Sequence, residues 1–106
     1  MSSIRKYPAA KRILIVEDEP HIQELISVNL TRAGHAVRCA PDAEQAREML
    51  VRWMPDLMLL DILLPDTEGY LLLERLKGDE RWRDVPVLML SSCPTAASTK
   101  KPARGA

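Results

Sequence analysis

Residues 57–69 read LMLLDILLPDTEG, and this stretch decides the fold. Leu57 to Leu60 form a fully apolar run, which is typical of a strand that is covered on both faces in a parallel sheet. Asp61 then stands at the carboxyl end of that strand. A loop with Pro65 follows, and a helix is predicted to begin at Gly69.

The rest of the chain continues this alternation of strand and helix. Apolar runs predict two further strands, at Ile13–Val16 and Val85–Leu90, and a short strand is predicted at Ala36–Ala40, with Val37 and Cys39 on one face. Apolar residues at helical spacing predict a helix from Pro20, with Gly34 as its C′ stop. Strands that alternate with helices predict one α/β domain with a parallel sheet and right-handed crossovers.

The helix between residues 42 and 55 has both ends marked in the sequence. Asp42 is the expected N-cap, and Gln45 three residues later would complete a capping box. Pro55 would end the helix. The predicted apolar stripe consists of Ala43, Ala46, Met49, Leu50 and Trp53.

The helix that begins at Gly69 is predicted to direct three leucines toward the core and to end near Gly78. These leucines are Leu72, Leu73 and Leu76. Asp79 to Asp84 is expected to be a charged connector to the last strand.

Composition divides the chain into a leader, a domain and a tail. We expect residues 1–10 to be a flexible leader, residues 11–91 an incomplete domain, and residues 92–106 a disordered basic tail. No apolar run has membrane-spanning length, and the N-terminus lacks the apolar core of a secretory signal. Cys39 and Cys93 are expected to be lone thiols, which favours a reduced, cytoplasmic protein.

The net charge of zero conceals an acidic body. All 15 acidic residues but only eight of the 15 basic ones lie between residues 13 and 99, so this part carries a net charge of −7. Such a pattern argues against direct binding of nucleic acid. The acidic charge instead favours a protein that binds a cation.

Four polar residues stand at the carboxyl ends of three predicted strands. They are Glu17, Asp18, Asp61 and Ser91. Ligands of open parallel sheets bind beyond these strand ends, and three carboxylates there would repel one another without a cation. Oxygen ligands at this density suit Mg²⁺, and a carboxylate can itself accept a phosphoryl group. Any one of these residues could be only a helix cap or a turn residue, but their joint placement favours a site.

Three blocks of this chain resemble the signature blocks of bacterial two-component response regulator receiver domains, in particular the phosphate-regulon type. The blocks are ILIVEDEP at 13–20, LMLLDILLPDTEG at 57–69 and VPVLMLS at 85–91. The resemblance implies a flavodoxin-like fold and a cytoplasmic signalling protein that takes phosphate from a sensor histidine kinase.

The resemblance also assigns roles to single residues. Asp61 would be the phosphoacceptor, and Mg²⁺ would be held by Glu17, Asp18, Asp61 and the backbone carbonyl of Leu63. Ser91 would hydrogen-bond the phosphoryl group in the switched state. Pro65 and Gly69 would shape the loop beside the site.

The family fold has five strands and five helices, whereas this sequence predicts four strands and three helices, so the fold is expected to be truncated after the fourth strand. The family's fifth-strand lysine has no clear match, because no apolar strand precedes Lys100 or Lys101. The fourth strand would then be an exposed edge, and we expect the chain to self-associate through it.

Two other functions fit the residues less well. The chain could be a receiver that is not phosphorylated and serves as a protein-binding module. It could also be an aspartyl-nucleophile phosphatase, but such enzymes need a second Asp two residues after the nucleophile, where this chain has Leu63. The favoured function is therefore a phosphate-accepting signalling module rather than an enzyme.

Overall fold

The computed structural model describes residues 10–90, and this part contains four strands and three helices. The strands are β1 (Arg12–Val16), β2 (Ala36–Ala40), β3 (Leu57–Asp61) and β4 (Val87–Leu90). The helices are α1 (Pro20–Arg32), α2 (Ala43–Arg52) and α3 (Gly69–Lys77). Residues 1–9 of the predicted leader, Ser91 and the whole predicted tail lie outside the described residues.

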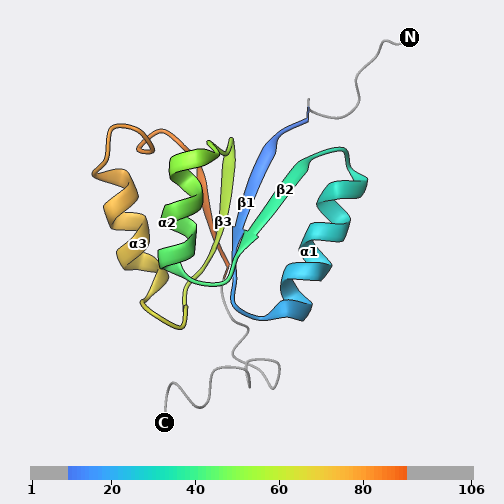
Figure 1. Cartoon of the computed structure of the whole chain (residues 1–106), viewed down its shortest axis with the longest axis horizontal. Helices are drawn as coiled ribbons and strands as arrows, with labels where there is room; N and C mark the ends of the chain where they lie inside the picture. The colour runs from blue at the N-terminus through green and yellow to red at the C-terminus, as the bar shows by residue number, and fades with distance from the viewer. Residues whose placement is uncertain (1–9, 91–106) are drawn as a thin grey trace.

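The four strands form one parallel sheet in the order β2-β1-β3-β4 (Figure 1). The chain leaves β1 in one direction to form β2, and then returns past β1 to form β3 and β4. Between β1 and β3 the strand order therefore reverses, and in sheets of this kind ligands bind at the carboxyl ends of the strands beside that point. The predicted parallel α/β fold is confirmed.

The helices cover both faces of the sheet. On one face, Ile26 and Leu30 of α1 pack against Ile13, Ile15 and Leu59. On the other face, α2 and α3 enclose a larger core, and Figure 1 shows these two helices side by side. The side chains of that core include Leu14, Val16, Ala46, Leu50, Met58, Leu60, Leu72 and Leu76. Consecutive residues of β1 and β3 alternate between the two cores, which explains why both strands are apolar throughout.

The predicted helix boundaries agree closely with the structure. Gly34 follows α1 with a φ of 98°, as expected of a C′ glycine. Asp42 caps α2, because its Oδ1 accepts a hydrogen bond from Gln45 N at 2.8 Å. The capping box is incomplete, since the Gln45 side chain contacts the Asp42 carboxylate at 3.4 Å instead of the Asp42 N–H.

The last strand is shorter than predicted, since it begins at Val87 and not at Val85. Pro86 has no N–H to donate to a strand ladder, although its carbonyl accepts a bond from Met58 N at 3.0 Å. Val85 N donates to Trp82 O at 3.0 Å, so Val85 closes the preceding turn. The Val85 side chain is nonetheless buried in the core.

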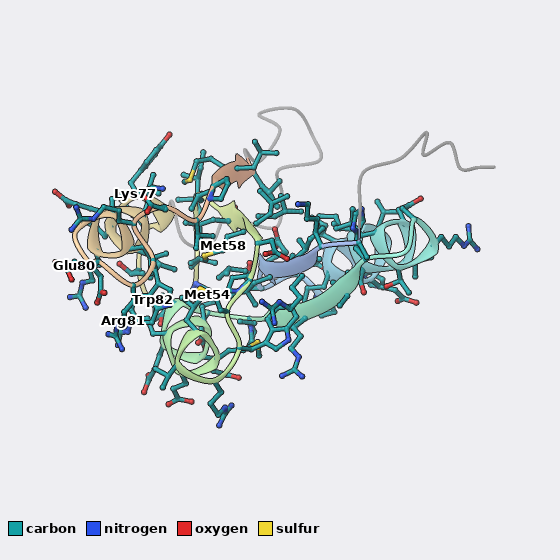
Figure 2. The ribbon with its side chains drawn as sticks, turned by 90° about the horizontal axis from the view of Figure 1, so that it is seen from above. Met54, Met58, Lys77, Glu80, Arg81 and Trp82 are labelled. Atoms are coloured by element: carbon teal, nitrogen blue, oxygen red, sulfur yellow. The ribbon has the colours of Figure 1, made fainter. Side chains whose placement is uncertain are left out.

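The predicted charged connector contains a core residue that the sequence did not reveal. Trp82 is only 7% exposed and packs into the core between α2 and α3, as Figure 2 shows. The Arg81 guanidinium lies over the Trp82 ring, 4.0 Å from its centroid. Lys77 Nζ at the end of α3 donates hydrogen bonds to Arg83 O and Val85 O, each at 3.0 Å. The connector is thus anchored to α3 and to the core.

Within residues 10–90, no helix has both the length and the apolar character that are needed to cross a membrane.

Candidate functional site

Three carboxylates meet where β1 and β3 end. Val16 and Leu60 are paired in the sheet, so Glu17 and Asp61, which follow them, lie side by side at this edge. Glu17, Asp18 and Asp61 each offer a carboxylate oxygen, and these oxygens lie within 4.8 Å of one another. We call these three residues the acidic cluster. The structure therefore brings together the three carboxylates that the sequence predicted as one site.

Two of the three residues of the acidic cluster are buried, and Asp18 is half-buried. Glu17 is 2% exposed and Asp61 is 1% exposed, and among residues 10–90 they are the two buried charged residues. A buried carboxylate is unfavourable unless hydrogen bonds or a cation compensate for the lost water. Charged side chains at these positions are therefore better explained by a site than by packing.

The backbone that carries Glu17 and Asp18 is held by β2 and α1. Glu17 N donates to Ala40 O at the end of β2, at 3.0 Å. The side-chain amide of Gln23 in α1 donates to the backbone carbonyl of Glu17. Glu19 N donates to Glu17 Oε2 at 2.9 Å, and Glu19 itself caps α1 by accepting from His21 N at 3.1 Å. The orientation of the Glu17 carboxylate is thus fixed by the start of α1.

Asp61 is held by β4 and by its own loop. Ile62 N donates to Leu90 O at 3.2 Å, which extends the ladder between β3 and β4 by one bond. Leu63 N donates to Asp61 Oδ1 at 3.2 Å and so orients this carboxylate. Leu63 also forms an antiparallel bridge with Glu68, which closes the loop of residues 62–68. We call this segment the β3–α3 loop.

Gly69 lies in close contact with the backbone of Asp61. A Cβ atom at Gly69 would lie 2.2 Å from Asp61 O and 3.1 Å from Ile62 Cα. Contacts below 3.0 Å essentially never occur for real Cβ atoms, so only glycine fits here. Pro65, in the middle of the loop, is exposed, whereas its neighbour Leu64 is buried.

Ser91, the fourth predicted site residue, lies outside the described residues, as do Lys100 and Lys101. Leu90, its neighbour in sequence, is paired with Asp61.

Residues 13–103 match the response regulator receiver domain family. The chain belongs to this family. Receiver domains bind Mg²⁺ through an acidic pocket, and this chain has such a group of carboxylates in its acidic cluster. The family that the three sequence blocks predicted is therefore confirmed.

Two transcriptional regulators are among the relatives of this receiver. The DNA-binding dual master transcriptional regulator RpaA of Synechocystis sp. is 44% identical over 76% of this chain and 34% of its own length. The phosphate regulon transcriptional regulatory protein PhoB of Pseudomonas aeruginosa is 46% identical over 77% of this chain and 36% of its own length. The chain thus spans about a third of the length of these relatives.

Solved receiver structures share the fold. The N-terminal domain of a response regulator receiver protein from Methanoculleus marisnigri superposes with a TM-score of 0.76 at 36% identity. The match covers 86% of this chain and 76% of that one. The flavodoxin-like receiver fold is therefore shown by an independent structure as well as by the strand order.

One residue near the site has a role that the sequence did not reveal. Asp66 is exposed in the β3–α3 loop, and its Oδ1 and Oδ2 accept hydrogen bonds from Ala43 N and Glu44 N of α2, each at 3.0 Å. Partial burial alone would raise the pKa of Asp66, but the two N–H groups and the positive charge of Arg47 outweigh it and lower this pKa. No local motif reveals such a contact, because its partners are 22 and 23 residues away.

Proposed function

We propose that this chain accepts a phosphoryl group on Asp61 from a partner sensor histidine kinase, in a reaction that requires Mg²⁺. The observation that carries the proposal is the burial of Asp61 within 4.8 Å of two further carboxylates at the point where the strand order reverses. In the proposed reaction an oxygen of Asp61 forms a bond to phosphorus while the P–N bond of the kinase phosphohistidine breaks. The product is an acyl phosphate on Asp61.

The donor set of the acidic cluster fits Mg²⁺. Hard divalent cations prefer carboxylate and carbonyl oxygens, and three carboxylate oxygens lie within 4.8 Å of one another here. We propose that Glu17, Asp18, Asp61 and the backbone carbonyl of Leu63 hold the ion. When bound, the ion supplies positive charge that offsets the charge on the transferred phosphoryl group.

The remaining predicted residues have supporting roles in this proposal. Gly69 allows α3 to begin against the backbone of Asp61, and Pro65 limits the conformations of the β3–α3 loop. Ser91 would donate a hydrogen bond to the phosphoryl group. Its place next to Leu90, which pairs with Asp61, is compatible with that role.

The metal part of the proposal is tested by titrating Mg²⁺ while following backbone amide chemical shifts. We expect Asp18→Asn to lower the affinity about tenfold or more, because a charged ligand is replaced by a neutral one. Glu68→Gln is the matched control, since Glu68 is exposed and its side chain makes no capping bond to α3. Shifts near residues 17, 18 and 61 that do not change through the millimolar range would contradict the site.

We also propose that the 106-residue chain self-associates through β4. Among residues 10–90, β4 pairs with β3 on one side and has no strand on its other side. Leu88 of β4 is 57% exposed, although it lies in an apolar strand. An exposed apolar edge strand is a template for pairing with a second copy.

Size-exclusion chromatography with light scattering tests this association. We expect a mass that rises with concentration, and Leu88→Lys should weaken the association about tenfold by removing one apolar side chain from the contact. Leu25→Lys is the control, because Leu25 is 64% exposed on α1, away from this edge. A monomer at high concentration with a sharp thermal transition would contradict the proposal.

A further inference from the structure

Asp66 joins two elements that are distant in the sequence. It lies in the β3–α3 loop, which follows Asp61, and its two carboxylate oxygens accept bonds from the first two N–H groups of α2. The third N–H group of α2, that of Gln45, is accepted by the helix's own N-cap, Asp42. The first turn of α2 is therefore capped by two aspartates, one from its own segment and one from the loop beside the acidic cluster.

The other backbone bonds of the β3–α3 loop mostly close the loop on itself. Leu64 N donates to Thr67 O at 3.1 Å, and Gly69 N donates to Ile62 O. The bonds of Asp66 differ, because they fix the loop relative to the body of the domain. Leu63, which the proposed function makes a ligand through its carbonyl, lies three residues before Asp66.

The side of the loop that carries Asp66 borders a cleft. A cleft of about 290 Å³ separates α2 from α3 beside Asp66, and its walls include Arg47, Thr67 and Arg75. Water therefore reaches this side of the loop, where the bonds of Asp66 tie the loop to α2. A carboxylate at a helix N-terminus suits this task, because the N–H groups and the helix dipole both favour its negative charge.

We infer that Asp66 is a positioning residue for the acidic cluster. Its bonds fix the β3–α3 loop against α2, so that Leu63 and Asp61 are held in the arrangement that receives the cation. The inference rests on the proposed function, because it concerns the same magnesium site. Asp66 itself does not belong to the acidic cluster.

Two variants that remove one cap each from α2 separate positioning from stability. Asp66→Ala removes the cap that comes from the loop, and Asp42→Ala removes the cap that comes from the helix's own segment. Both should lower the melting temperature, because each leaves N–H groups of the first turn without their acceptor. Only Asp66→Ala should lower the Mg²⁺ affinity, by about threefold to fivefold. This decrease is smaller than the one expected when a group that bonds directly to a metal ligand is removed. Asp66→Asn keeps one acceptor oxygen and should give an intermediate value.

Hydrogen exchange of the Leu63 amide in metal-free protein is the second measurement. This N–H is bonded to Asp61 Oδ1, so its exchange rate reports on the loop without any metal. We expect it to exchange about threefold faster in Asp66→Ala and at the wild-type rate in Asp42→Ala. Equal effects of the two variants on both measurements, or no effect of either, would overturn the inference. A wild-type chain that binds no Mg²⁺ would instead refute the proposed function, and the exchange rates would still decide whether Asp66 holds the loop.

Discussion

Gly69→Ala should lower the free energy of unfolding by about 3 kcal/mol or more, a large part of the stability of a domain of this size. The added methyl group would lie 2.2 Å from Asp61 O, and the atoms that it meets belong to the backbone and cannot rotate away. To accommodate it, either α3 or the end of β3 must move. We therefore expect the variant to lose Mg²⁺ binding together with stability, as measured by urea unfolding and by titration.

Gly78→Ala is the matched control for this prediction. Gly78 is the C-cap of α3 with a φ of −86°, and a Cβ there would approach Glu74 O no closer than 3.5 Å. An alanine fits this conformation and reduces the freedom of the unfolded chain, so the change should be within about 1 kcal/mol of neutral. Equal unfolding free energies for the two variants would show that the close approach of α3 to Asp61 does not constrain residue 69.

Asp61→Asn should abolish phosphorylation by a small acyl-phosphate donor. The substitution preserves the shape of the side chain and an oxygen that can accept the bond from Leu63 N. It removes the negative charge and the nucleophilic carboxylate, so no acyl phosphate can form. We expect an acid-stable, base-labile label on the wild-type chain and none above background on the variant.

Asp56→Asn controls for nonspecific labelling. Asp56 is an exposed aspartate just before β3, at the opposite end of this strand from Asp61, and its carboxylate accepts a bond from Arg12 N at 2.8 Å. This variant should be labelled like the wild type. Label that persists in Asp61→Asn would contradict the assignment of the phosphoacceptor.

Much of the fold was predictable because its signals are local. The apolar runs of β1 and β3 and the turn residues Gly34 and Asp42 all act through near neighbours in the sequence, and their predicted roles are confirmed. The convergence of the acidic cluster was also predictable, since parallel strands present their carboxyl ends at one edge.

The features that sequence reasoning missed depend on tertiary contacts. Trp82 lies among charged residues in a turn, yet its ring is buried in the core between α2 and α3. The start of β4 was misplaced because an apolar run does not reveal that Val85 bonds back to Trp82. Asp66 resembles any solvated loop residue until the N-terminus of α2 is placed beside it.

The most direct test of the proposed function locates the phosphoryl group on the wild-type chain. The protein is incubated with an acyl-phosphate donor with and without Mg²⁺, the acyl phosphate is reduced with borohydride, and the modified residue is identified by peptide mass spectrometry. We predict one modified residue, Asp61, and modification only when Mg²⁺ is present. Modification of a Ser or Thr instead, or of Asp61 to the same extent without Mg²⁺, would contradict a magnesium-dependent phosphoacceptor at this site.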